Sequence, residues 1–261
     1  MSDANVLIDQ ADPAVTVVTL NRPEKRNALS VQLLRELLAA LQAASADRSR
    51  RVLILNANDP VFCAGLDLKE SADSKHRQES ARLLCDVYKS LTANPQITIV
   101  AAQGAAIGGG VGLLSACDIA IAADDLQIGF PEVKRGLVAA LVTALVRRQV
   151  NDRVLRELVL LGKTISAADA MAIGLVNQRV PGTGLMAAAR AVAAQAIQSA
   201  PLAVQRTKEL LDELTSHPVS QTLEQAMRYH VEGRDSAEAI EGIAAFLEKR
   251  EPRWPPRKGT E

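Results

Sequence analysis

Residues Gln103–Asp118, QGAAIGGGVGLLSACD, decide how the rest of the chain is interpreted. Three consecutive glycines, Gly108–Gly110, lead into an apolar segment of helical character. Glycine is a poor helix former, so three together at a helix start need a physical reason. One reason is a ligand that approaches the backbone too closely for any side chain, because a helix N-terminus offers unpaired N–H groups to an oxygen carrying negative charge. The other reason is a tight turn into a closely packed helix, and the stretch alone leaves both open.

The composition is that of a globular protein with a large core. Hydrophobic residues make up 48% of the 261 positions and aromatic residues only 2%, so the core consists mainly of Leu, Ala, Val and Ile. Equal numbers of basic and acidic residues, 30 each, argue against nucleic acid or an acidic membrane as the main partner. No apolar run reaches the roughly 18 residues of a membrane span, and the N-terminus, MSDANVLIDQ, lacks the pattern of a signal peptide.

The cysteines and histidines indicate neither a disulfide framework nor a metal site. Cys63, Cys85 and Cys117 are odd in number and lack metal-type spacing, and the three histidines are scattered. We therefore expect reduced thiols, no metal and a cytoplasmic location.

The apolar pattern predicts strands alternating with helices in the first part of the chain and helices alone in the last part. Strands are expected over residues 5–9, 14–20, 51–56, 97–102, 118–122 and 176–180, with a short one in 126–136. Helices are expected after the N-cap Ser30 and over residues 77–92, 111–116, 137–150, 154–161, 167–173, 185–199, 202–216, 219–232 and 236–249. The chain thus divides into an α/β core, residues 1–199, and a helical region, residues 200–261, that we expect to bury apolar faces against other subunits.

Two loops of this core are suited to hold one oxygen atom between them. Gly65 and Leu66 follow a strand, and Gly108–Gly110 precede a helix. If the loops meet, the N–H groups of Leu66 and Gly109 point at the same oxygen. Removing one donor of such a pair typically raises a reaction barrier by about 2.7–4 kcal/mol.

Seven short motifs, in matching order and spacing, resemble the enoyl-CoA hydratase/isomerase family, the crotonase superfamily. They are Asn21-Arg22-Pro23 with Asn27–Leu29, Phe62–Leu68, Gly104 with Gly108–Gly110, Cys117-Asp118, Pro131-Glu132 with Gly136–Val138, Ala170 with Gly174–Val176, and Glu241-Gly242 with Phe246–Arg250. Each motif is weak alone, but together they cover nearly the whole chain. The resemblance implies a spiral of ββα units with a C-terminal helical trimerisation region, a homotrimer or hexamer, and a coenzyme A thioester substrate with no separate cofactor.

The resemblance also assigns roles by position. Leu66 and Gly109 would be the backbone donors to the thioester oxygen, and Glu132 the acid or base, with a pKa raised by an apolar pocket. Positions that match the substrate-binding segments are Lys25, Arg26, Ala28, Ala64, Leu66, Asp67, Leu68, Lys69, Gly109 and, near the C-terminus and acting from a neighbouring subunit, Lys249. Plain surface charge is the alternative for the three basic residues Lys25, Arg26 and Lys249. For Asp67 we prefer a role in ordering its loop.

One departure from the family pattern bears on the reaction. Ordinary hydratases of the family carry two glutamates, and here the second position is Gly112. A single carboxylate can move a proton between two carbons, which is double-bond isomerisation. It can also still activate a water, with help from Glu70, Asp73 or a water chain. We predict hydration of a 2-enoyl-CoA, with 3-enoyl-CoA to 2-enoyl-CoA isomerisation and non-catalytic CoA-ester binding as the alternatives.

Overall fold

The computed structural model describes residues 4–67, 70, 74–214, 237–238, 241, 244–245 and 248–253. A six-stranded sheet in the order β1-β2-β3-β4-β6-β9 forms the centre, and a smaller sheet in the order β5-β7-β8 lies beside it. The strands are β1 Val6–Asp9, β2 Val15–Leu20, β3 Val52–Ala57, β4 Ile97–Ala102, β5 Ala105–Ile107, β6 Ile119–Ala123, β7 Gln127–Gly129, β8 Thr164–Ser166 and β9 Gln178–Val180. The helices are η1 Pro23–Lys25, α1 Val31–Ala46, α2 Ser74–Thr92, α3 Gly109–Ala116, η3 Pro131–Arg135, α4 Ala140–Val146, α5 Asp152–Leu161, α6 Ala167–Ala172, η4 Gly182–Gly184, α7 Leu185–Ala196 and α8 Pro201–Leu214.

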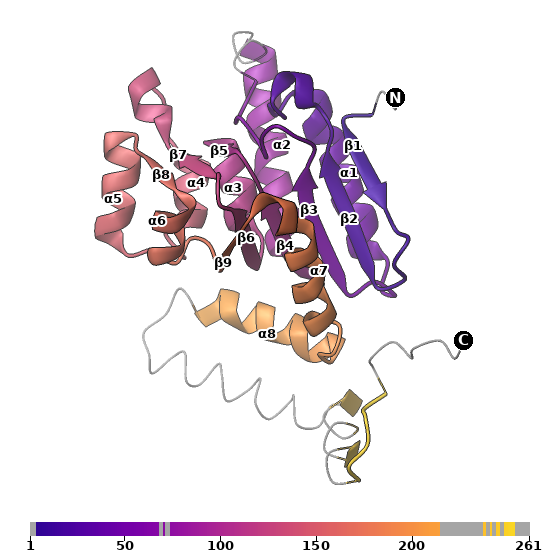
Figure 1. The fold of residues 1–261 in the computed structure, drawn as a ribbon. Coiled ribbons are helices and arrows are strands. Elements are labelled where there is room, and N and C mark those ends of the chain that lie inside the picture. The colour runs from indigo at the N-terminus through magenta and orange to yellow at the C-terminus, as the bar shows by residue number, and fades with distance from the viewer. Residues whose placement is uncertain are drawn as a thin grey trace.

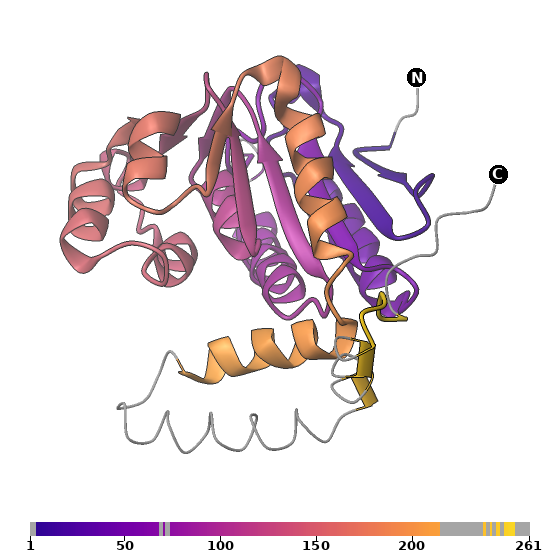
Figure 2. The ribbon, with the colours of Figure 1, turned by 60° about the horizontal axis from the view of Figure 1, so that its bottom comes forward.

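The large sheet is covered on both faces, which explains its continuous apolar strands. Helices α1, α2 and α3 lie against one face and α7 crosses the other (Figures 1 and 2). Successive side chains of a strand point to opposite faces. In β3, Leu53 and Leu55 therefore join the core under α1 and α2, while Val52 and Ile54 join the core under α7. All pairs of the large sheet except β1–β2 are parallel, as expected for a sheet buried on both sides.

The first helix begins where its sequence predicts. Ser30 is the N-cap of α1, and its hydroxyl oxygen accepts a hydrogen bond of 3.1 Å from the Leu33 N–H. Three leucines at helical spacing, Leu33, Leu37 and Leu41, are fully buried against the sheet.

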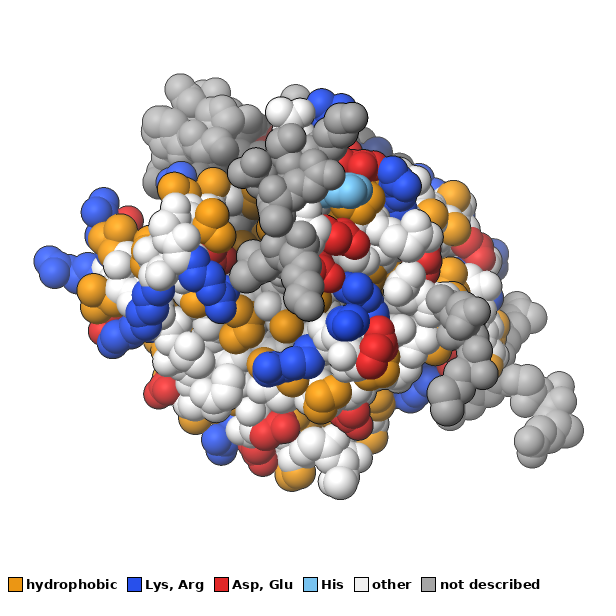
Figure 3. Space-filling view, turned by 90° about the horizontal axis from the view of Figure 1, so that it is seen from above, with side chains coloured by type: hydrophobic (Ala, Val, Ile, Leu, Met, Phe, Trp, Pro, Cys, Tyr) orange, Lys and Arg blue, Asp and Glu red, His pale blue; other side chains and the backbone are white. Residues whose placement is uncertain are grey.

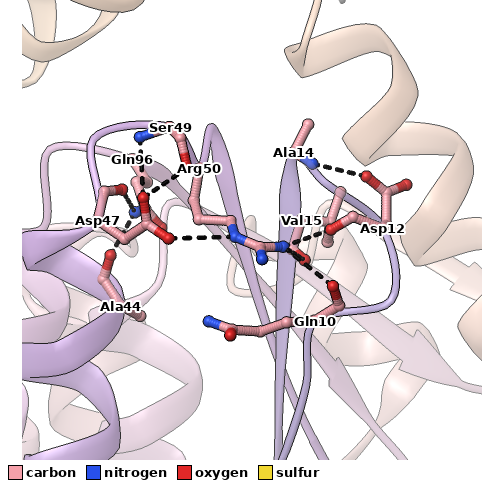
Figure 4. A network of polar contacts seen from close by, with 9 residues as sticks. All are labelled: Gln10, Asp12, Ala14, Val15, Ala44, Asp47, Ser49, Arg50 and Gln96. Atoms are coloured by element: carbon pink, nitrogen blue, oxygen red, sulfur yellow. Dashed lines mark hydrogen bonds and ion pairs between the residues drawn. The ribbon is translucent and has the colours of Figure 1, made fainter.

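The connection from α1 to β3 is fixed by the side chain of Arg50 (Figure 4). Its guanidinium donates to the Val15 carbonyl at 3.1 Å and to a carboxylate oxygen of Asp47 at 3.3 Å. Gln96 donates at 2.6 Å to the Ala44 carbonyl in the last turn of α1. These contacts join the β1–β2 turn, the end of α1 and the start of β4, at the end of the sheet remote from the glycine-rich loop.

The structure differs from the expected local structure at three places. The helix expected over residues 137–150 is only α4, because the chain leaves Gly136 in a left-handed conformation and Leu137 and Val138 stay exposed. Strands β5 and β8, of three residues each, were not predicted. Helix α3 begins at Gly109 rather than at residue 111, so two of the three glycines are helical.

The described part of the C-terminal region is tied to the core through α8. Lys208 of α8 donates to Asp118 at 2.6 Å and to the Gln96 carbonyl at 2.8 Å. The helix expected over 219–232 and most of the one expected over 236–249 lie outside the described residues. In the described part of the chain, no helix is long and apolar enough to cross a membrane, and the three cysteines are free thiols.

Candidate active site

The structure brings together the two loops that the sequence singled out. The Leu29 N–H donates to the Gly65 carbonyl at 2.8 Å, and the Ile107 N–H donates to the Cys63 carbonyl at 2.9 Å. The segment 62–67 therefore lies between the residues that precede α1 and the end of β5. A β-carbon on Gly109 would stand 3.8 Å from the Leu66 nitrogen, and one on Gly65 would stand 3.8 Å from the Gly109 nitrogen. The two loops therefore meet in the structure, which was the condition for a shared oxygen site.

The N–H groups of Leu66 and Gly109 are left available by this arrangement. Leu29 and Leu66 form a parallel bridge, in which Leu29 bonds to the two neighbours of Leu66: its N–H donates to the Gly65 carbonyl, and its carbonyl accepts from the Asp67 N–H. The N–H of Leu66 itself therefore faces away from Leu29. Gly109 is the first residue of α3, where N–H groups have no partner in the helix. Among the residues that the structure describes, neither N–H has a hydrogen-bond acceptor. Two adjacent donors of this kind can hold a single anionic oxygen.

Glu132 lies against the same glycine-rich turn. It is in the 3-10 helix η3 directly after β7, and a β-carbon on Gly108 would come within 2.6 Å of its Oε1. Its Oε2 is buried and has no hydrogen-bond partner among the described residues. Burial raises the pKa of Glu132 above the usual glutamate value, although its own backbone N–H and the charge of Arg135 oppose the shift. The direction agrees with the expectation for a carboxylate that acts as a base near neutral pH.

The place beside Gly112 is filled by Tyr88 of α2. A β-carbon on Gly112 would fall 2.0 Å from the Tyr88 Oη and 2.2 Å from its Cζ, so any side chain there would collide with the phenol. The ring is buried, and Oη donates a hydrogen bond of 2.8 Å to the Gly109 carbonyl. Burial, with the nearby acidic groups Cys63 and Glu132, raises the pKa of Tyr88 well above its usual value, so the hydroxyl stays protonated. Sequence reasoning missed Tyr88, although its spacing from Leu84 on α2 already marks one buried face.

The segments expected to bind coenzyme A adjoin each other. The Ala64 N–H donates at 3.0 Å to the carbonyl of Arg26, which has a left-handed backbone with φ of 53°. Lys25 and Arg26 are exposed, and Ala28 is half-buried. On the face in Figure 3, basic and acidic side chains are interspersed, so no patch of one sign dominates it. Leu68 and Lys69 lie outside the described residues.

Polar side chains within these segments hold their shape. The Asp67 carboxylate accepts a hydrogen bond of 2.8 Å from Arg22, whose guanidinium also donates to the Ala28 carbonyl at 3.2 Å. The buried Asn27 accepts from the Arg22 N–H at 2.8 Å and donates to the Val61 carbonyl at 2.7 Å. These contacts support a loop-ordering role for Asp67.

Three further candidate residues, Glu70, Asp73 and Lys249, remain to be located. Glu70 accepts a hydrogen bond of 2.8 Å from the Val31 N–H at the start of α1, which gives it a structural partner, and Asp73 lies outside the described residues. Lys249 is exposed, and its contact with coenzyme A from a neighbouring subunit stays a prediction. Within the described ranges, no cluster of His, Cys, Asp or Glu side chains could hold a metal.

The spiral core and this site define a protein of the crotonase fold. A family model for enoyl-CoA hydratase/isomerase matches residues 10–257. The chain belongs to the enoyl-CoA hydratase/isomerase family and is an enzyme of the crotonase superfamily.

Individual relatives are similar along almost their entire length. The chain is 34% identical to a putative enoyl-CoA hydratase of Thermus thermophilus, over 92% of this chain and 97% of that protein. It is 33% identical to human enoyl-CoA hydratase domain-containing protein 2, mitochondrial, over 93% of this chain and 86% of that protein. The solved enoyl-CoA hydratase of Bacillus anthracis superimposes with a TM-score of 0.91 at 30% identity, covering 96% of this chain and 99% of that one. Pseudomonas aeruginosa AtuE does so with a TM-score of 0.89 at 33% identity, covering 97% and 100%.

Proposed function

We propose that this enzyme hydrates a 2-enoyl-CoA thioester, with Glu132 as its acid–base group. The observation that carries the proposal is the Glu132 carboxylate beside the glycine-rich turn. Its Oε1 lies next to Gly108, the residue that immediately precedes the Gly109 donor, and its buried Oε2 has no hydrogen-bond partner among the described residues. Leu66 and Gly109 supply the N–H groups for the thioester oxygen. Similarity to several proteins named as enoyl-CoA hydratases supports the same reaction.

The proposed reaction needs only one carboxylate. Ionised Glu132 takes a proton from water while the water oxygen bonds to C3 of the acyl chain. The electron pair of the C2–C3 double bond moves toward the thioester oxygen, where the Leu66 and Gly109 N–H groups stabilise the resulting enolate. Glu132 then returns its proton to C2, so one water has been added and the enzyme is restored.

Isomerisation of a 3-enoyl-CoA is the second candidate, and the Tyr88–Gly112 contact favours it. Because the phenol fills the space beside Gly112, that position offers no second carboxylate to hold a water. Glu132 would take a proton from C2, form a dienolate held by the same two N–H groups, and return the proton to C4. This reaction moves the double bond without water.

The two reactions are separated by the mass of the product. Purified enzyme is mixed with 2-enoyl-CoA and 3-enoyl-CoA esters of short, long and branched chains, beside Glu132→Gln and a control, Glu36→Gln. Glu36 is a half-buried glutamate that accepts a bond of 2.8 Å from the Asn5 N–H in another part of the core. Gain of one water by wild type and the control, lost in Glu132→Gln, supports hydration. An isomer of unchanged mass supports the second candidate, and binding without turnover would show a CoA-ester-binding protein.

The proposal includes self-assembly into a trimer or hexamer. Leu202 and Leu211 on α8 are exposed large apolar residues, and Leu160 and Leu161 at the end of α5 are exposed as well. We assign these exposed apolar side chains on α5 and α8 to contacts with other subunits. Sedimentation of the full chain gives the number of subunits, and a monomer at micromolar concentration would contradict this part of the proposal.

A further inference from the structure

We propose that Tyr88 is a positioning residue of the oxyanion site, whose hydroxyl fixes the peptide that follows Gly109 and thereby the place of Gly109, the residue whose N–H faces the thioester oxygen. The inference rests on the proposed function, because it assigns Gly109 the role of a donor. Tyr88 touches no reacting atom in this scheme and acts through Gly109 alone.

The glycine-rich turn needs such a support. Gly108, Gly109 and Gly110 carry no side chains that would restrict their backbone, and glycine is the most conformationally free residue. A donor that must keep one direction within about 10–20° therefore depends on groups from outside the turn. Helix α2, which packs against α3, supplies two of them (Figure 1).

Leu84 and Tyr88, one turn apart on α2, hold Gly109 from two sides. A β-carbon on Gly109 would lie 3.7 Å from Leu84 Cδ2, so this methyl group packs near the glycine Cα. Tyr88 Oη donates at 2.8 Å to the Gly109 carbonyl, and both atoms are buried. The leucine restricts translation of Gly109, while the hydrogen bond restricts rotation of the peptide between Gly109 and Gly110. The peptide on the other side of Gly109, which carries its N–H, is held by the bond of 3.2 Å from the Gly112 N–H to the Gly108 carbonyl.

The chemistry of the phenol suits this role. Burial raises the Tyr88 pKa well above its usual value, and the neighbouring Glu132 adds to the shift. The hydroxyl is therefore a permanent donor throughout the pH range in which Glu132 changes charge. The same ring explains why residue 112 is glycine, because the phenol occupies the space that a side chain at this position would need.

Tyr88→Phe keeps the ring and removes only the donor. A buried hydrogen bond between neutral groups is worth roughly a factor of ten in an equilibrium constant. We expect kcat to fall about tenfold because the donor is aligned less well in the transition state, with binding of a saturated acyl-CoA changed less than twofold. The infrared band of the thioester carbonyl in bound butyryl-CoA, which shifts to lower frequency when the oxygen accepts hydrogen bonds, should move back toward its position in water.

Thr98→Val is the matched control. Thr98 is fully buried at the start of β4, and its hydroxyl donates at 2.9 Å to Asp118, away from the glycine-rich turn. It should lose stability, as Tyr88→Phe does, yet keep the wild-type kcat and carbonyl band. Wild-type kcat and an unshifted band in Tyr88→Phe would overturn the inference, and so would equal losses in both variants. If wild type turns over no ester, the proposed function fails instead, while the carbonyl band of bound butyryl-CoA still tests Tyr88.

Discussion

Replacing Gly112 by alanine should destabilise the enzyme, although alanine is the better helix former. Gly112 lies inside α3, where the substitution alone would stabilise by about 1 kcal/mol. The new β-carbon, however, would stand 2.0 Å from Tyr88 Oη and 2.2 Å from Cζ. Carbon atoms in contact are about 3.5–4.0 Å apart, so the phenol must retreat by more than ~1 Å.

The magnitude follows from what surrounds the phenol. Tyr88 is 4% exposed, so its ring retreats into a packed core, and overpacking of this kind costs about 1–3 kcal/mol. The retreat also breaks the bond to the Gly109 carbonyl, at a cost of about 0.5–1.5 kcal/mol. After the gain in helix propensity, a net loss of about 2 kcal/mol remains.

Urea unfolding at 25 °C measures this loss in a double-mutant cycle. Tyr88→Leu removes the atoms that collide, and in that background Gly112→Ala should cost nothing or stabilise by up to ~1 kcal/mol. Gly182→Ala is the control, because no atom lies within 4 Å of the added β-carbon. A Gly112→Ala cost that is the same in both backgrounds, within about 0.5 kcal/mol, would refute the reasoning.

Further predictions concern the acid–base group, the substrate loop and the thiols. Glu132→Gln should lower kcat by about 10²–10⁴ with little change in binding of a saturated acyl-CoA, and steady-state kinetics with near-normal kcat would contradict the proposed role. Because the pKa of Glu132 is raised and the base must be ionised, kcat/KM should fall tenfold per pH unit below that pKa. The midpoint of this acidic side of the pH profile should lie above the usual pKa range of glutamate. A midpoint at the ordinary glutamate pKa would contradict the effect of burial. Asp67→Asn weakens the 2.8 Å contact with Arg22 and should raise KM severalfold with kcat retained, whereas a fall in kcat alone would point to another role. Burial raises the pKa of Cys63 to about 12 and raises that of Cys117 as well, so a thiol reagent at pH 8 should modify both only after unfolding. Rapid modification of either thiol in the native protein would contradict this prediction.

Local chemistry explains why much of the core was predictable from sequence. A hydroxyl residue followed by leucines at helical spacing sets the start of α1, and the continuous apolar runs of β3 and β4 mark strands buried on both faces. The meeting of the Gly65 and Gly109 loops was predictable only as a condition. In the structure, two long-range bridges bring the loops together, one from Leu29 to Leu66 and one from Cys63 to Ala106.

The features that sequence could not show depend on distant partners. β5 and β8 have three residues each, too few for a periodic pattern, and they exist because both pair with β7. The sequence shows that position 112 is glycine, but it does not show what excludes a side chain there. Tyr88 lies 24 positions earlier, and only the packing of α2 on α3 brings its phenol to that space.

The three glycines that opened the question have different reasons to be glycine. A β-carbon on Gly110 would lie 2.7 Å from the Cys63 carbonyl oxygen, so this position serves close packing. At Gly108 the obstacle is the Glu132 carboxylate, at 2.6 Å, and at Gly109 it is a Leu29 methyl group, at 3.0 Å. All three obstacles are atoms of this chain, so close packing accounts for each glycine, and the same packing shapes the proposed oxygen site. Packing at Gly110 brings the segment that carries Cys63 and Leu66 against α3, and that contact places Leu66 beside Gly109, with the Glu132 carboxylate next to Gly108.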